Sequence, residues 1–160
     1  MTATAPLSAE PLGELKLHRL LVAVDGSENA ELALKAAITA GHRDHASLTV
    51  MTVGPDLASG AAAWAASTGN AIDQEAVDRD LCKQLSEIVD RIPEDIPVKT
   101  LYRRGHAGPE IVKAAKEGDY DAIVLGARGV GRVGALLGSV SNHVLHHANV
   151  AVFVAHAPKP

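Results

Sequence analysis

Glycine and arginine gather in one short stretch near the carboxyl end of the chain. Residues 126–139 read Gly-Ala-Arg-Gly-Val-Gly-Arg-Val-Gly-Ala-Leu-Leu-Gly-Ser. Glycine lets several backbone N–H groups converge on one anion, and the N-terminus of a following helix favours the same charge. Because Ser139 opens a predicted helix and Arg128 and Arg132 add positive charge, the stretch predicts a phosphate site. The alternative is a flexible connection that ends in a simple helix cap.

Two well-known phosphate motifs fit this stretch poorly. The chain has no Gly-Lys pair, which a P-loop requires. The segment from Gly129 to Gly134 does match the dinucleotide pattern Gly-x-Gly-x-x-Gly, but the preceding strand ends three residues earlier, at Gly126. The acidic residue that would hold the ribose is also missing, because no Asp or Glu follows Asp121. Nicotinamide dinucleotides are therefore not favoured.

The elements that position this stretch alternate between continuous apolar runs and longer apolar stripes of helical spacing. Continuous runs predict buried strands at residues 19–25, 47–53, 97–103, 121–126 and 150–156. Helical spacing or helix-start signals predict helices at residues 28–42, 72–92, from 108 onward, and 139–148. Residues 54–70, which contain Trp64, are interpreted as a loose insert, with a short helix as the alternative.

Alternation of strands and helices predicts an α/β fold, namely a single doubly wound parallel five-stranded sheet with helices on both faces. We expect a mobile tail over residues 1–15 and one domain over residues 16–160. Ligands of such sheets bind at the carboxyl ends of the strands. The predicted ends lie near Asp25, Val53, Arg104 and Gly126.

Composition restricts the classes of partner. Aromatic residues make up only 2% of the chain and the net charge is −4, so the sequence predicts no nucleic-acid binding. No apolar run approaches the roughly 18 residues of a membrane helix, and residues 1–14 lack the features of a signal peptide. The single cysteine, Cys82, excludes a disulfide within the chain and is expected to be inert. We therefore expect a cytoplasmic protein that makes no contact with membranes.

Several segments together resemble the universal stress proteins, over nearly the whole chain from Leu17 to Ala157. The resemblance is carried by Val24-Asp25-Gly26-Ser27, Gly108-Pro-Glu-Ile-Val-Lys-Ala-Ala, Asp121-Ala-Ile-Val-Leu-Gly126, Leu137-Gly138-Ser139-Val140 and Val150-Ala-Val-Phe-Val. The ATP-binding branch of that family carries Gly-x2-Gly-x9-Gly-Ser/Thr. This chain has Gly126-x2-Gly129-x8-Gly138-Ser139, which is one residue shorter.

The resemblance implies a strand order of 3-2-1-4-5 and a site for ATP, with Mg²⁺. It places Asp25 near the ribose, where the side chain also fits a helix-capping role, and the backbone of Val53 at the adenine edge. The phosphate cradle would comprise Gly126, Gly129 and Gly138, with Arg128 at the γ-phosphate. Ser139 and Val140 would contact ribose and phosphate, and Ala23 and Val24, just before Asp25, are assigned to the same site.

The resemblance implies an ATP-binding stress-response or regulatory module with an unidentified protein partner. The apolar edge strand Val150–Val154 predicts a homodimer. One alternative is a dimeric interaction protein that does not bind ATP, which the shorter glycine spacing favours. Others are a cyclic AMP binder and a slow ATP hydrolase. No catalytic residues are assigned, because Asp25 is the only acid predicted near the cradle.

Two further features carry weaker signals. His143 and His147 stand four apart on a predicted helix, a spacing that can hold one metal ion. Without a nearby acid they are interpreted as surface residues, and no metal site is assigned. Trp64 could form a flap over the nucleotide or an anchor for a partner, or it could be a loosely packed residue of the insert.

Overall fold

The computed structural model describes residues 13–71, 73–129 and 137–158. The described strands are β1 Arg19–Ala23, β2 Ser47–Gly54, β3 Val98–Arg104, β4 Ala122–Gly126 and β5 Ala151–Ala155. The described helices are α1 Glu28–Asp44, α2 Ala58–Thr68, α3 Gln74–Val89, α4 Ala107–Glu117 and α5 Ser139–His147. Most of the predicted tail (residues 1–15) lies outside the described residues, as do Gly131, Arg132 and Gly134.

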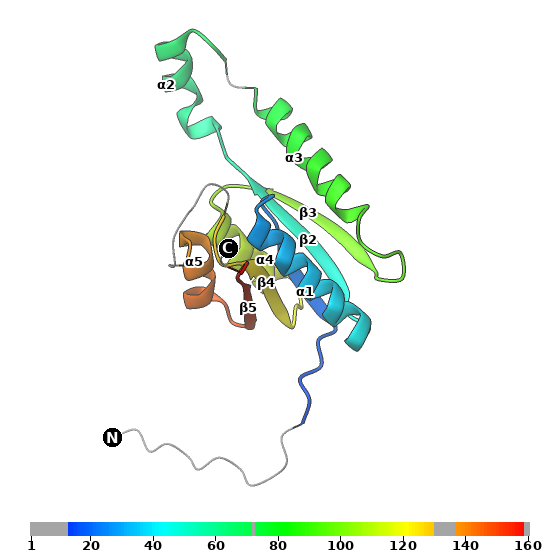
Figure 1. The fold of residues 1–160 in the computed structure, drawn as a ribbon. Helices are drawn as coiled ribbons and strands as arrows, with labels where there is room; N and C mark the ends of the chain where they lie inside the picture. The colour runs from blue at the N-terminus through cyan, green and yellow to red at the C-terminus, as the bar shows by residue number, and fades with distance from the viewer. Residues whose placement is uncertain (1–12, 72, 130–136, 159–160) are drawn as a thin grey trace, which may run out of the picture.

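The described strands form one parallel sheet in the order β3-β2-β1-β4-β5, as the family resemblance implied (Figure 1). β1 lies at the centre, with Val22 opposite Val50 of β2 and Val124 of β4. Chain order reverses direction on either side of β1, so the carboxyl ends of β1 and β4 border a topological switch point. Open α/β sheets bind ligands at such points.

Helices cover both faces of this sheet because the central strands are apolar on both sides. Leu20, Leu21 and Val22 of β1 are all fully buried and alternate between two hydrophobic cores. The first core packs α1 and α3 on one face, and the second packs α4 and α5 on the other. The doubly wound α/β fold predicted from the sequence is therefore confirmed.

Element boundaries differ from the sequence predictions in places. The insert contains the helix α2, so the short-helix alternative is correct and the loop prediction is wrong for Ala58–Thr68. α3 is shorter than predicted because Asp73 caps its start, and it ends at Val89, before the first proline. In Figure 1 α2 projects away from the sheet, whereas α3 contacts β2 and β3. None of the described helices is long and apolar enough to cross a membrane.

Candidate functional site

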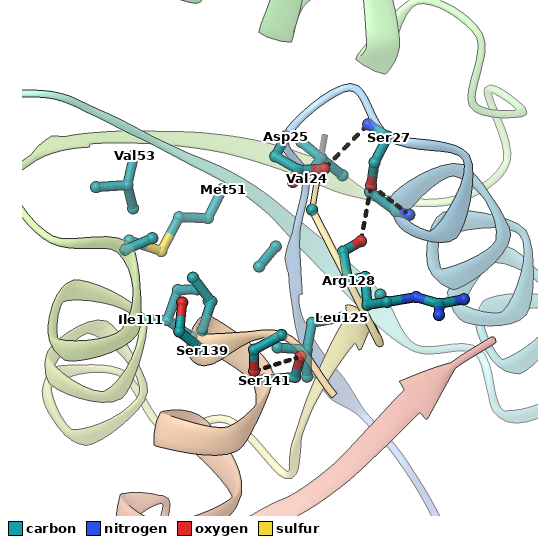
Figure 2. A pocket seen from close by; sticks show the side chains of 17 residues that line it. Val24, Asp25, Ser27, Met51, Val53, Ile111, Leu125, Arg128, Ser139 and Ser141 are labelled. Carbon is teal, nitrogen blue, oxygen red and sulfur yellow. Dashed lines mark hydrogen bonds between the residues drawn. The ribbon is translucent and has the colours of Figure 1, made fainter. Parts of the chain in front are cut away.

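A cavity of about 160 Å³ opens at the carboxyl ends of β1 and β4, beside the start of α5 (Figure 2). All ten residues that the sequence assigned to a nucleotide site line this cavity: Ala23, Val24, Asp25, Val53, Gly126, Arg128, Gly129, Gly138, Ser139 and Val140. Seven residues that were not assigned also line it: Ser27, Ala30, Met51, Ala107, Ile111, Leu125 and Ser141. The fold thus brings together segments that are more than 100 positions apart in the sequence.

The turn after β1 shapes one side of the cavity. Gly26 adopts φ +79°, a conformation that suits glycine, and the Asp25 carboxylate accepts a hydrogen bond from the Ser27 N–H at 3.0 Å. Ser27 in turn caps α1, because its Oγ accepts from the Ala30 N–H at 3.2 Å. Ser27 rather than Asp25 therefore caps α1, and the Ser27 N–H holds the Asp25 side chain at the cavity.

Hydrogen bonds close the base of the glycine-rich loop. The Ala127 carbonyl accepts from the Gly138 N–H at 2.7 Å and from the Oγ of the buried Ser141 at 2.6 Å. The Ala127 N–H donates to the Ala155 carbonyl at the end of β5, at 2.8 Å. Both ends of the loop are therefore fixed to one another and to the sheet. The one-residue shortening falls between Gly129 and Gly138, where residues 130–136 lie outside the described residues.

Asn29 is a supporting residue that the sequence analysis missed. Its side chain is 9% exposed and joins two distant segments. The Asn29 Nδ2 donates to the Arg128 carbonyl at 3.3 Å, and its Oδ1 accepts from the Ala157 N–H at 2.7 Å. The Ser27 Oγ also donates to the Arg128 carbonyl, at 3.3 Å. The side chains of Ser27, the N-cap of α1, and of Asn29, in its first turn, therefore hold the backbone where the glycine-rich loop begins.

Close backbone approach explains two of the cradle glycines. A Cβ atom at Gly126 would lie 2.7 Å from the Asn29 carbonyl carbon and 2.8 Å from the Ala30 nitrogen. A Cβ atom at Gly129 would lie 2.6 Å from the Asp25 Oδ2. Side chains at these positions would therefore displace α1 or Asp25, and glycine keeps the strand ends and the loop in contact.

The N-terminus of α5 provides the clearest electrostatic feature of the cavity. Its N-cap is Gly138, which has no side chain to satisfy the N–H groups of the first turn. Ser139, Val140 and Ser141 of that turn line the cavity. Unsatisfied N–H groups and the helix dipole together favour an anion at this place.

Arg128 lines the cavity, but its charged side chain does not lead towards α5. Figure 2 shows its side chain leading away from Ser139, towards α1. Its Nε is buried and has no hydrogen-bond partner among the described residues. In this conformation the guanidinium does not face the first turn of α5, and its expected contact with a γ-phosphate stays a prediction.

The opposite wall of the cavity is apolar. Met51 and Val53 of β2, Leu125 of β4 and Ile111 of α4 project their side chains towards it (Figure 2). Met51 and Val53 lie two positions apart on one strand and therefore share a face. That alternation is the sequence signal that identifies Met51 once Val53 is assigned. An apolar wall opposite an anion-binding helix terminus is suited to a ligand with a flat apolar part and a negative group.

The insert lies outside the lining of this cavity. Trp64 of α2 is 52% exposed and is not among the lining residues.

A polar cluster attaches α3, the helix after the insert, to β3. Asp78 of α3 accepts from the Tyr102 hydroxyl at 2.5 Å and from the Arg104 Nε at 2.8 Å. Burial and this hydrogen bond raise the pKa of Tyr102 to about 12. The Tyr102 and Arg104 hydrogen bonds lower the pKa of Asp78, although its desolvation opposes them.

Comparison with known proteins connects this geometry to a family. The model of the universal stress protein family matches residues 16–156. A universal stress protein of Synechocystis sp. is 31% identical over 147 residues, which cover 85% of this chain and 96% of the relative.

Two solved structures resemble the fold. Universal stress protein UspA from Lactobacillus plantarum is 27% identical, with a TM-score of 0.70 over 89% of this chain and 99% of that chain. The universal stress protein from Archaeoglobus fulgidus in complex with dAMP is 25% identical, with a TM-score of 0.60 over 88% of this chain and 99% of that chain. The sheet order, the glycine-rich loop and these matches agree, and the chain belongs to the universal stress protein family.

Proposed function

We propose that this protein binds ATP, with Mg²⁺, in the cavity at the carboxyl ends of β1 and β4, as a regulatory module of the stress response. One observation carries the proposal. The first turn of α5, which has no side-chain cap, lies across the cavity from the apolar wall. Phosphate would be held by the N–H groups of that turn and by the loop that Gly126 and Gly129 begin. The base would lie against Met51 and Val53.

The cavity is large enough to enclose only part of a nucleotide. Its volume of about 160 Å³ is below the roughly 300 Å³ at which sites that enclose a whole small molecule begin. The adenine would fill the enclosed part, and the phosphates would extend towards Gly138. The complex of the Archaeoglobus fulgidus relative with dAMP supports an adenine nucleotide as the ligand class.

Asp25 fits a supporting role for the metal ion. It is the carboxylate among the lining residues, and Mg²⁺ in nucleotide sites is usually held by one or two carboxylates, the phosphates and water. Hydrolysis would need a positioned water and a charge clamp in addition. Since the Arg128 guanidinium leads away from the first turn of α5, we assign binding as the activity and no catalytic residue. Slow hydrolysis is the enzymatic alternative.

The edge strand supports the proposed homodimer. β5 pairs with β4 on one side only, and its Phe153 is 42% exposed. An apolar edge strand offers unpaired backbone groups to a second copy. We propose antiparallel pairing through Val150–Val154, with an unidentified protein partner that senses nucleotide occupancy. The exposed, unpaired Cys82 is compatible with the reducing cytoplasm, where we place the protein.

The alternative is a dimeric interaction protein that does not bind ATP, and the one-residue-shorter glycine spacing favours it. Titration of the apo protein with ATP, ADP and cyclic AMP, each with Mg²⁺, in a calorimeter separates these functions. The proposal expects ATP to bind most tightly. Equal affinity for cyclic AMP would show that the site recognises only the adenosine and one phosphate. If none of the three nucleotides binds, the result would favour the interaction protein.

Hydrolysis is tested separately, by phosphate release from wild-type protein and from Asp25→Ala. A slow hydrolase would lose turnover in Asp25→Ala while it keeps its affinity for ATP. Equal loss of turnover and affinity would instead assign Asp25 to binding. Arg104→Ala is a suitable control, because this exposed arginine contacts Asp78, away from the cavity lining.

A further inference from the structure

Two histidines of α5 form a pair that the proposed nucleotide site does not use. The imidazole rings of His143 and His147 are stacked, with centroids 4.1 Å apart and planes inclined by 17°. His143 lies in the middle of α5 and His147 at its last residue, whereas the N-terminal turn of this helix borders the cavity. His146 also lies in the last turn but is not part of this stacked pair.

A hydrogen bond fixes the tautomer of His147. Its Nδ1 lies 2.8 Å from the backbone carbonyl of His143. A carbonyl oxygen can only accept, so Nδ1 carries the hydrogen and the neutral ring keeps its lone pair on Nε2. Histidines that bind metal ions usually donate their second ring nitrogen in this way, which orients the ring and makes the free nitrogen a better ligand.

The neighbouring helix restricts the ring of His143. A Cβ atom at Gly108 of α4 would lie 2.9 Å from both the Cβ and the Cγ of His143, so only glycine lets α4 approach this closely. His143 is consequently half-buried, while His147 is exposed. Packing on one ring and a hydrogen bond on the other limit the conformations that the two side chains adopt.

We propose that His143 and His147 bind one divalent transition-metal ion between them. Zinc, nickel and copper are the ions that imidazole nitrogen favours, whereas magnesium and calcium favour oxygen. The stacked rings hold their in-plane lone pairs nearly parallel, so the rings must rotate out of the stack before both nitrogens reach one ion, at zinc–nitrogen bonds of about 2.0–2.1 Å. Among the described residues no group of three or more His, Cys, Asp or Glu side chains is arranged to hold a metal. Water therefore completes the coordination.

Metal binding would stabilise the carboxyl-terminal turns of α5. The ion links two side chains one helical turn apart, and any ligand that binds only the folded state raises its stability. The pair lies away from the cavity lining, so this stabilisation requires no nucleotide. The two sites can therefore be tested independently of one another.

Calorimetric titration of untagged protein with zinc chloride tests the proposal. We expect one ion per chain, and an affinity at least about tenfold lower in His143→Asn and in His147→Asn. His146→Asn is the matched control, because it removes an exposed histidine from the same turn and should keep the wild-type affinity. Zinc should also raise the melting temperature of the wild type and of His146→Asn alone. Absence of saturable binding, or equal weakening in His146→Asn, would overturn the proposal.

A second measurement covers the case in which His143→Asn does not fold. In the wild-type protein, substoichiometric Cu²⁺ broadens the imidazole NMR signals of the residues that bind it. We expect the signals of His143 and His147 to disappear first among those of the eight histidines. Earlier loss of any other histidine signal would place the ion elsewhere and contradict the assignment. Neither measurement uses ATP, so failure here leaves the proposed nucleotide site untouched.

Discussion

Gly138 is a residue at which the proposed phosphate binding can be tested by a single substitution. It is the N-cap of α5, and its N–H already donates to the Ala127 carbonyl. A Cβ atom at this position would lie 3.3 Å from the Ala127 oxygen and 3.4 Å from the Arg128 Cα, which is tight but tolerable. A larger side chain can therefore be accommodated by the fold while it covers the first turn of the helix.

We predict that Gly138→Val folds and loses at least about tenfold in ATP affinity, because its methyl groups occupy the space over the N–H groups that would hold phosphate. Calorimetry measures the affinity and circular dichroism measures the fold. Gly13→Val is the matched control, since nothing lies within 4 Å of a Cβ atom there. Unchanged ATP affinity in folded Gly138→Val would show that the turn beside Gly138 does not hold phosphate.

Asn29 provides a second test at this scale, through the backbone of the loop. In Asn29→Asp an oxygen replaces the Nδ2 donor and faces the Arg128 carbonyl, while the acceptor for the Ala157 N–H is kept. Two facing acceptors repel, so we expect the start of the loop to shift and ATP affinity to fall about tenfold. The exposed Asn70→Asp makes the same chemical change and should bind as the wild type does. A folded Asn29→Asp protein with full affinity would show that this contact does not position the loop.

The same residues mark the limit of what the sequence could predict. Gly126, Gly129, Gly138 and Asp25, which line the cavity, could be assigned from the sequence because their types and short spacing carry a local signal. Asn29 and Ser141 act by hydrogen bonds to the backbone, and the Arg128 carbonyl lies 99 positions from Asn29. A bond between a side chain and a distant carbonyl leaves no pattern in one sequence. The direction of the Arg128 side chain, which leads towards α1 in Figure 2, likewise depends on tertiary structure.

At the scale of elements, strands and helices with a clear apolar period were predicted well. β1 is buried on both faces and therefore appears as a continuous apolar run, and α3 shows one apolar stripe. α2 was ambiguous for a physical reason: its residues are mainly small and uniform, so they give no apolar face. Tertiary contacts do not resolve the ambiguity either, because α2 projects away from the sheet (Figure 1).

The cluster that attaches α3 to β3 predicts a pH dependence. A free tyrosine has a pKa of about 10, whereas that of Tyr102 is raised to about 12 by burial and by Asp78. The unfolded chain therefore loses this proton first, and the stability that Tyr102 contributes is present below pH 10 and lost as pH rises towards 12.

We predict that Tyr102→Phe lowers the free energy of unfolding by about 1 kcal/mol at pH 8, through loss of a hydrogen bond to a carboxylate. The difference between variant and wild type should shrink from pH 10 upward, because the variant has no proton to lose at this position. Urea unfolding at several pH values measures both effects. Tyr120→Phe removes a hydroxyl elsewhere and serves as the control. A difference that stays constant to pH 11 would contradict the assigned pKa.

For the molecule as a whole, the proposed homodimer depends on the edge strand β5. It closes one edge of the sheet, and Phe153 and Leu145 are exposed to a similar extent, at 42% and 43%. Only Phe153 lies on the edge strand, so a charge there should disrupt strand pairing between copies. We predict that Phe153→Glu raises the dimer dissociation constant at least about tenfold, whereas Leu145→Glu leaves it unchanged. Sedimentation velocity over a concentration series measures both, and equal effects would move the interface away from β5.

The most direct test of the central claim is the nucleotide content and affinity of the unmodified protein. Freshly purified protein is denatured and the released small molecules are identified by mass spectrometry, and the apo protein is then titrated with ATP and Mg²⁺. We predict released adenine nucleotide or saturable, micromolar ATP binding at one site per chain. An empty protein that ignores ATP would contradict it, and would leave the loop between Gly129 and Gly138 with a structural role in a protein that works through its dimer.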